Sequence, residues 1–191
     1  METARSVADG VVVVVPPTPG GGTDRSSPAD ERRPGGGADR TVAGGDTRAA
    51  SVRAGLAAVP DDAAVIVVHD AARPLATGFL FDAVVDVVRS GRAAGAIPVL
   101  PVADTLKRVT GETVDSTVDR EGLVTVQTPQ AFEAAVLRAA HAGAGEASDD
   151  AGLVEQLGAT VLTVPGDPRN LKITRPEDLE LAEHFLRTVQ G

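Results

Sequence analysis

A run of four β-branched residues, Val65 to Val68, stops at His69 and Asp70. An aliphatic run of this kind, without polar alternation, is typical of a parallel strand buried on both faces. In an open α/β sheet, ligands gather outside the carboxyl ends of the strands. The run therefore predicts a reactive edge at Asp70 and Arg73. Spacing alone leaves an alternative open, in which these two residues pair with each other and shape the following turn.

Other apolar patterns along the chain alternate between strand and helix. Short aliphatic runs predict strands, and an apolar residue every three or four positions predicts helices that lie on a sheet. This alternation favours one α/β domain with helices flanking a Rossmann-like, mostly parallel sheet. We predict strands at 11–15, 96–100, 124–126 and 161–164, and helices at about 52–59, 79–88, 129–139, 151–157 and 179–189.

Some polar residues near the starts of predicted helices can be explained by a structural role, without any role in binding or catalysis. Thr128 is accounted for as the cap of a helix that starts with Pro129. Lys172 is accounted for as a solvated charge before a capping box at 174–177. The last helix is expected to bury a stripe of apolar residues, namely Leu179, Ala182, Phe185, Leu186 and Val189.

The composition excludes several kinds of function. With four Phe, no Trp and no Tyr, the chain has almost no surface on which bases stack, and its net charge of −9 repels a polyanion. The absence of cysteine excludes disulfides, thiolate catalysis and Cys-ligated zinc. The longest aliphatic run, Val11 to Val15, is far shorter than a membrane span. We expect a cytoplasmic protein that binds neither nucleic acid nor membrane, although a small phosphorylated ligand suits it.

Two segments depart from the strand and helix pattern. Residues 18–40 are rich in Gly, Pro and charge, so we predict a flexible loop rather than a phosphate-binding one, because no helix follows its glycines. Residues 102–126 alternate polar and β-prone side chains around Thr110-Gly111, which predicts a protruding β-arm. The pair Gly44-Gly45 either makes a tight turn, which two glycines alone favour, or lets backbone approach a ligand.

Five segments agree in order and spacing with one enzyme family. They read GGDTRAASVRAGL, VVHDAARPL, PVADTLKR, VDREGLVTVQTPQAF and SDDAGLVEQLG with NLKITRPEDL. On these motifs the chain resembles the 2-C-methyl-D-erythritol 4-phosphate cytidylyltransferase family. The resemblance implies one nucleotidyltransferase domain over residues 1–191. It also implies that the enzyme joins the cytidylyl group of CTP to the sugar-alcohol phosphate, releasing pyrophosphate, in non-mevalonate isoprenoid biosynthesis.

The resemblance assigns the nucleotide to two of these motifs. Carried over residue by residue, it places Gly45, Asp46 and Ser51 near the cytosine. It places Ala71 beside the ribose. On this basis we expect Gly45 to lie at the nucleotide, which the residues alone left open.

The resemblance also implies how the reacting phosphates are held. Asp70 would hold Mg²⁺ and substrate, a suitable role for a hard carboxylate oxygen, and Arg73 would lie at the reacting phosphates. Lys172 would stabilise charge on the α-phosphate during attack. Arg120 and Thr128 match positions that hold the methylerythritol phosphate.

Assembly follows from the same resemblance. The arm at about 102–126 is expected to contact a second subunit and make a homodimer, with Arg120 reaching the partner's site. Its polar alternation provides too little apolar surface for the arm to stand alone.

One family motif is not found in the chain. Members carry an Ala-Ala-Gly-x-Gly-x-Arg loop, ending in Pro-Lys, that wraps the CTP phosphates, and residues 1–40 contain no such loop. We therefore expect an amino-terminally incomplete domain. Two alternatives stay open: a pentitol-phosphate cytidylyltransferase that shares the nucleotide loops, and a non-catalytic remnant of the family.

Overall fold

A computed structural model describes residues 2–16, 38–143 and 147–189 of the chain. Its helices are α1 (Glu2–Val7), α2 (Arg48–Ala58), α3 (Gly78–Arg89), α4 (Ala134–His141), α5 (Asp150–Gln156) and α6 (Pro176–Val189). Its strands are β1 (Val12–Val15), β2 (Arg40–Ala43), β3 (Val65–Val68), β4 (Gly95–Pro101), β5 (Leu106–Thr110), β6 (Thr113–Val118), β7 (Val124–Val126), β8 (Gln130–Glu133) and β9 (Val161–Pro165).

Strand β4 lies at the centre of a five-stranded sheet. β9 pairs with one side of β4 in parallel, while β8 and then β7 pair antiparallel with its other side. β8 also pairs antiparallel with β3, so β3, β4 and β9 run in one direction and β7 and β8 in the other. The predicted α/β class is confirmed. Three of the five strands run in one direction, but only the pairing of β4 with β9 is parallel. The two strands of opposite direction are β7, the last part of the arm, and β8, which follows it.

The strand β8 replaces the start of an expected helix. The sequence predicts a helix from Pro129, whereas the chain is extended over Gln130–Glu133 and α4 begins at Ala134. Ala131 and Phe132 of β8 are fully buried between β3 and β4. Pairing on both edges of β8 therefore decides its conformation, and the helical spacing of its apolar residues does not.

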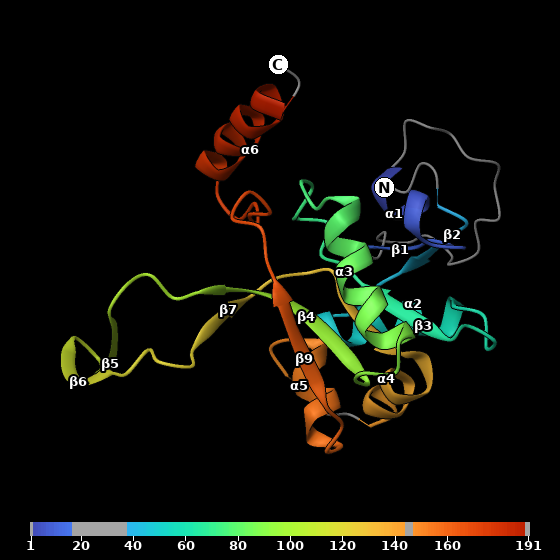
Figure 1. The fold of residues 1–191 in the computed structure, drawn as a ribbon, viewed down its shortest axis with the longest axis horizontal. Helices are drawn as coiled ribbons and strands as arrows, with labels where there is room; N and C mark the ends of the chain where they lie inside the picture. Colours follow the sequence, from blue (N-terminus) through green and yellow to red (C-terminus); the bar gives the residue numbers. More distant parts are fainter. Residues whose placement is uncertain (1, 17–37, 144–146, 190–191) are drawn as a thin grey trace.

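Both faces of the sheet are covered, which explains the unbroken β-branched run of β3. Ile66 and Val68 face a cluster formed with α2, α4 and α5, and Val65 and Val67 face a cluster formed with α3 (Figure 1). The buried members of the first cluster are Leu56, Ile66, Ile97, Phe132, Ala134, Leu137, Ala151 and Val154. Those of the second are Val84, Val87, Val88, Ala93, Ala96, Ala131 and Val164.

The arm and helix α6 project from this body (Figure 1). The hairpin β5–β6 lies at the tip of the arm and turns at Gly111, whose φ of +59° favours glycine. This confirms the predicted hairpin. β1 and β2 form a separate parallel pair next to α2. The loop expected at 18–40 falls on residues 17–37, which lie outside the described residues, and Arg40 already belongs to β2.

Helix α6 differs from expectation in its buried face and its cap. Ala182 is buried, but Leu179 and Leu186 are about half exposed, at 50% and 51%. The carboxylate of Asp178, rather than Glu177, accepts hydrogen bonds from the backbone N–H of Thr174 and of Arg175. None of the described helices is both long enough and apolar enough to cross a membrane.

The close contact of β4 with β8 makes a prediction about Gly95. A Cβ atom at this position would lie 2.6 Å from Cδ1 of Phe132, which is fully buried. We expect Gly95→Ala to lower the free energy of unfolding by about 1–3 kcal/mol, because overpacking forces side chains away from their rotamers. Urea denaturation followed by circular dichroism measures this. Gly10→Ala is the control, since its Cβ would meet only Asp39 at 3.8 Å, and equal losses would contradict the prediction.

Candidate active site

The carboxylate of Asp70 lies between two cations at the end of β3. Its Oδ2 lies 2.9 Å from Nζ of Lys172, and its Oδ1 lies 3.7 Å from Nε of Arg48. The backbone N–H of Arg73 donates to the carbonyl of Asp70 over 2.9 Å, which closes the turn after the strand. The side chain of Asp70 is 19% exposed and that of Lys172 is 45% exposed. Asp70 thus lies beside two basic residues from distant segments, Arg48 and Lys172, neither of which is the Arg73 expected beside it.

Arg73 reaches a different set of partners. Its Nη1 donates to the carbonyl of Asn170 over 2.7 Å, and its Nη2 donates to the carbonyl of Val126 over 3.3 Å. Burial lowers the pKa of Arg73, although the charge of Asp70 opposes this shift. Arg73 and Asp70 form no side-chain ion pair in the described structure, so the alternative is wrong in pairing their side chains, although the backbone bond between them does shape the turn. Arg73 instead ties the turn after β3 to the segment that carries Lys172.

Thr128 has a role different from the predicted helix cap. Its Oγ1 accepts a hydrogen bond from the backbone N–H of Asp70 over 3.0 Å and lies 3.1 Å from Nδ1 of His69. Nε2 of His69 faces the carbonyl of Arg73 at 3.1 Å. Because a carbonyl only accepts, Nε2 carries the proton and Nδ1 accepts from the hydroxyl of Thr128. Burial lowers the pKa of His69, which keeps its ring neutral at pH 7.

The turn between β2 and α2 holds the residues assigned to the nucleotide. The backbone N–H of Gly45 donates to Oγ of Ser51 over 3.2 Å, and Asp46 is exposed. A Cβ atom on Gly45 would lie 2.5 Å from Cβ of Ala50, so only glycine fits against the first turn of α2. Gly45 is therefore required for packing against α2, independently of any role in binding a ligand. Ala71 is exposed, directly after Asp70.

Sequence reasoning missed Arg48 and the buried pair behind it. Nη2 of Arg48 donates to Oδ2 of Asp150 over 2.7 Å, and Oδ1 of Asp150 lies 2.9 Å from Nε2 of His141. Burial by itself raises the pKa of Asp150, but the hydrogen bonds from His141 and Arg48 outweigh it and hold that pKa below its ordinary value. One signal was available, because a cation in the first turn of a helix opposes the helix dipole.

Sequence reasoning also missed a buried amide network beside Thr128. The side chain of Asn170 donates to the carbonyl of Thr128 over 2.8 Å and is fully buried. Nε2 of Gln127 donates to the carbonyl of Asp167 over 2.9 Å, and Oε1 of Gln127 accepts from the N–H of Asp167 over 3.1 Å. These bonds fix the 166–170 turn, two residues before Lys172. No local periodicity marks amides that act between segments.

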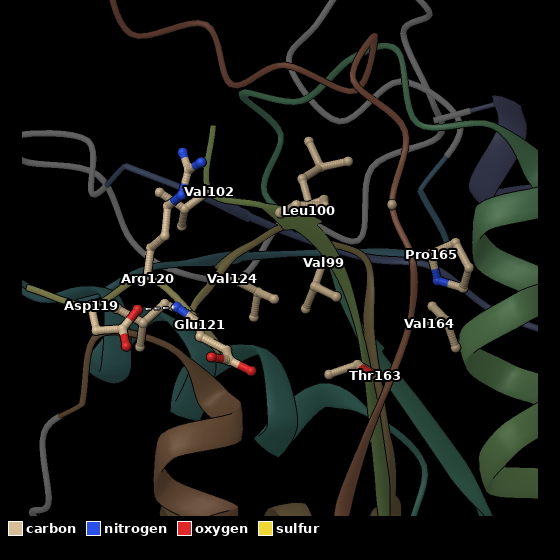
Figure 2. Close-up of a pocket in the computed structure, with 14 residues that line it drawn as sticks. Val99, Leu100, Val102, Asp119, Arg120, Glu121, Val124, Thr163, Val164 and Pro165 are labelled. Atoms are coloured by element: carbon tan, nitrogen blue, oxygen red, sulfur yellow. Dashed lines mark hydrogen bonds between the residues drawn. The ribbon is translucent and has the colours of Figure 1, made fainter. Parts of the chain in front are cut away.

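Arg120 lies away from this cluster. It lines a pocket of about 830 Å³ at the base of the arm, and its Nη1 donates to the carbonyl of Ala103. Figure 2 shows Arg120 and Glu121 on one side of this pocket and Thr163 and Val164 on the other. Asp70, Thr128 and Lys172 do not line it. Within the described part of one chain, Arg120 therefore does not meet the other predicted site residues.

The described ranges contain no group of three or more His, Cys, Asp or Glu side chains arranged to hold a metal ion. Asp70 is the one predicted metal-binding residue, and its Oδ1 accepts no hydrogen bond from the residues that the structure describes. A divalent cation held by one carboxylate takes its other ligands from water and from the phosphates of a substrate.

Comparison with known proteins points to one family. The sequence profile of 2-C-methyl-D-erythritol 4-phosphate cytidylyltransferase matches residues 6–188. Proteins of that name from Nocardia farcinica and Streptomyces coelicolor are 48% and 44% identical over 96% of this chain, which covers 76% and 70% of their lengths. A bifunctional relative from Solidesulfovibrio magneticus is 50% identical over 75% of this chain, which spans 36% of that protein.

Solved structures agree with the sequence matches. The 2-C-methyl-D-erythritol 4-phosphate cytidylyltransferase from Thermus thermophilus superposes with a TM-score of 0.79 and is 41% identical. The match covers 96% of this chain and 85% of that chain.

The hydrogen bond between Thr128 and Asp70 makes a second prediction. Thr128→Val keeps the shape of a buried side chain but leaves the N–H of Asp70 and the ring of His69 without this hydroxyl. We expect the free energy of unfolding to fall by about 1–3 kcal/mol, the cost of unsatisfied buried groups. Thr125→Val is the control, because that exposed threonine makes only a 3.4 Å contact with the carbonyl of Leu100, and we expect a change within about 0.5 kcal/mol. Thermal and urea unfolding would refute the prediction if both variants changed equally.

Proposed function

The chain belongs to the 2-C-methyl-D-erythritol 4-phosphate cytidylyltransferase family of nucleotidyltransferases, and we propose that the cluster around Asp70 is where its transfer occurs. In this proposal CTP and 2-C-methyl-D-erythritol 4-phosphate give 4-diphosphocytidyl-2-C-methyl-D-erythritol and pyrophosphate. A phosphate oxygen of the sugar alcohol bonds to the α-phosphorus of CTP, and the bond from that phosphorus to the β-phosphate bridging oxygen breaks. A cytoplasmic location belongs to the same proposal.

The observation that carries the proposal is the placement of Lys172, Asp70 and Arg48 within one charged row at the end of β3. Phosphoryl transfer needs positioned reactants and fixed positive charge more than a covalent intermediate. The ammonium group of Lys172 is partly exposed, so breaking its ion pair with Asp70 costs little free energy. It can therefore move from Asp70 to a phosphate oxygen of the substrate. Its charge then stabilises the α-phosphate most where negative charge is greatest, in the transition state.

We propose that Mg²⁺ binds at Asp70 in this charged row. Oδ1 of Asp70 is free of hydrogen bonds from described residues, and a carboxylate with substrate phosphates is a usual Mg²⁺ environment. The bound ion would supply charge neutralisation at the triphosphate. Asp70 is the residue that would hold the ion. The contact between Nζ of Lys172 and Oδ2 of Asp70 would break when Lys172 moves to the phosphate.

The remaining roles follow the chain's own geometry and the family. Gly45 and Asp46 in the exposed turn before α2, and Ser51 in the first turn of α2, are proposed for the cytosine. Ala71 is exposed where the ribose is expected. Thr128, whose hydroxyl already orients Asp70, is proposed to contact the sugar-alcohol phosphate. Arg73 binds the carbonyl of Asn170 and so holds the turn that precedes Lys172. We therefore propose that Arg73 positions Lys172 and does not itself bind phosphate as a free cation.

Two alternatives are separated by ligand binding and turnover. The relatives' names favour the methylerythritol phosphate over a pentitol phosphate, and turnover with each sugar phosphate distinguishes them directly. A non-catalytic remnant differs from an enzyme in showing no turnover with either. Calorimetric titration of the chain with CTP and Mg²⁺ adds the binding step, for which enzyme substrates usually show micromolar to millimolar affinity.

We further propose a homodimer formed through the arm. Its described apolar residues include five that are more than a third exposed: Val109, Val114, Leu123, Val124 and Val126. Exposed apolar residues gathered on one projecting segment are typical of a protein contact. A second subunit would cover them and would bring the partner's arm, with its arginine, toward the cluster around Asp70.

Substitutions of Asp70 and Lys172 test the site. Lys172→Ala and Asp70→Asn are expected to lower turnover about a hundredfold or more, since each removes a preorganised charge at a reacting phosphate. For Lys172→Ala we expect little change in CTP affinity, because the charge that it stabilises is greatest in the transition state. Pyrophosphate release measures turnover, and titration calorimetry measures affinity.

Stability measurements provide the control for these two variants. The Lys172–Asp70 pair is partly exposed, and such pairs contribute about 0–1 kcal/mol to folding. Melting temperatures should therefore stay near that of the parent chain. Early melting of both variants, or turnover at the parent rate, would show that the assigned roles are wrong.

The homodimer is tested by sedimentation at micromolar concentration. We expect the mass of two chains for the parent and of one chain for Leu123→Asp, because a buried unpaired charge at an interface is costly. Leu186→Asp on α6 is the matched control, since it introduces the same charge at a comparably exposed leucine outside the arm. A parent that sediments only as a monomer would contradict the dimer.

A further inference from the structure

Arg48 occupies an unfavourable position unless it binds something negative. It is the first residue of α2, and a cation in the first turn of a helix opposes the dipole of that helix. The helix already has a cap, because Oγ1 of Thr47 accepts from the N–H of Ala50 over 3.1 Å. Arg48 is therefore not needed to start α2, and its function lies in the groups that it faces.

One end of the Arg48 guanidinium is fixed by a buried carboxylate. Asp150 is fully buried, and its two oxygens contact Nη2 of Arg48 at 2.7 Å and Nε2 of His141 at 2.9 Å. Asp150 also begins α5, where a negative charge suits the helix dipole. Burial alone would lower the pKa of Arg48, but the hydrogen bond and charge of Asp150, with the charges of Asp70 and Asp149, raise it. The arginine is thus held charged and in one orientation.

The other end of the guanidinium faces Asp70 and carries N–H groups that make no hydrogen bond to the described residues. Nε lies 3.7 Å from Oδ1 of Asp70, which is too long for a hydrogen bond. Nη1 and Nε donate to no group among the residues that the structure describes, and the side chain is 35% exposed. A planar guanidinium with free donors and a fixed edge matches the oxygens of a phosphate group.

We propose that Arg48 is a further phosphate-binding residue of this site, and that Asp150, held by His141, positions it. The proposal rests on the function proposed above. Arg48 and Ser51 lie in the first turn of α2, directly after Gly45 and Asp46. Because Gly45, Asp46 and Ser51 are the residues proposed for the cytosine, the phosphate is one of the nucleotide rather than that of the sugar alcohol. Asp150 and His141 do not touch the ligand and act through Arg48 alone.

The first experiment separates phosphate binding from support of the turn. Titration calorimetry with Mg²⁺ present measures the dissociation constants of CTP, of pyrophosphate and of cytidine, which has no phosphate. We expect Arg48→Gln to weaken CTP and pyrophosphate about ten- to a hundredfold, as for the loss of hydrogen bonds to a charged group, and to leave cytidine within twofold. Arg187→Gln is the control for net charge, because that residue lies on the exposed surface of α6, and it should bind all three like the parent.

The second experiment tests the positioning role. Asp150→Asn should weaken CTP several-fold in the parent and have no further effect in the Arg48→Gln background, because it acts only through Arg48. His141→Gln, which keeps an N–H for Asp150, should weaken CTP less than Asp150→Asn does. If Asp150→Asn does not fold, the same cycle is made with Asp150→Glu and His141→Ala, each checked by circular dichroism.

The outcomes separate the inference from the proposed function. If the parent binds CTP and Arg48→Gln binds it equally well, or loses CTP and cytidine to the same degree, Arg48 binds no phosphate while the proposed function stands. If the parent binds neither CTP nor pyrophosphate, both proposals are wrong. If Asp150→Asn weakens CTP equally with and without Arg48, the positioning role is wrong. In a separate titration with 2-C-methyl-D-erythritol 4-phosphate, an Arg48→Gln variant that loses affinity for that sugar phosphate alone would overturn the assignment to the nucleotide.

Discussion

Strand β8 pairs with β3, and the position of Asp70 follows from that pairing. The antiparallel register sets Val68 opposite Gln130, so two residues beyond Val68 the chain reaches Asp70, opposite Thr128. The hydroxyl of Thr128 then accepts the N–H of Asp70. Because a strand register changes only by whole residues, a slip of β8 would turn its buried face outward and remove this contact. Burial of Ala131 and Phe132 between β3 and β4 therefore fixes the place of this carboxylate as well as the core.

A second set of bonds brings Lys172 to the same point from the far side of β4. β9 runs parallel to β4 and ends with the N–H of Gly166 donating to the carbonyl of Val99. Gln127 and Asn170 then bind the following turn to the segment between β7 and β8. The carbonyl of Asn170 accepts from Arg73 as well. Lys172 is thus placed by buried amides and one arginine, which leaves its own ammonium group free to exchange partners.

Charge is distributed unevenly through this region. Asp150 and His141 are buried and bonded to each other, with Arg48 as the second partner of Asp150, whereas Lys172 and Arg48 keep one face toward solvent. Breaking a buried pair costs far more than breaking an exposed one. The buried groups therefore serve to hold geometry, and the exposed ends of the two cations are the parts suited to bind phosphate.

Local patterns in the chain were enough to establish the class of fold, most of its elements and the family. The β-branched run at 65–68 indicated a strand covered on both faces, and the turn at Gly111 indicated the arm. Several separate motifs indicated one enzyme family, because each of these motifs is a short contiguous segment that can be recognised without knowing the fold. Long-range contacts were needed to establish that 130–133 is a strand, that Thr128 supports Asp70 rather than a helix, and that Arg48 and Asp150 lie beside the site. Each of these depends on contacts between segments about 35 to 100 residues apart. The spacing of side chains within one segment does not indicate which distant segment it will contact.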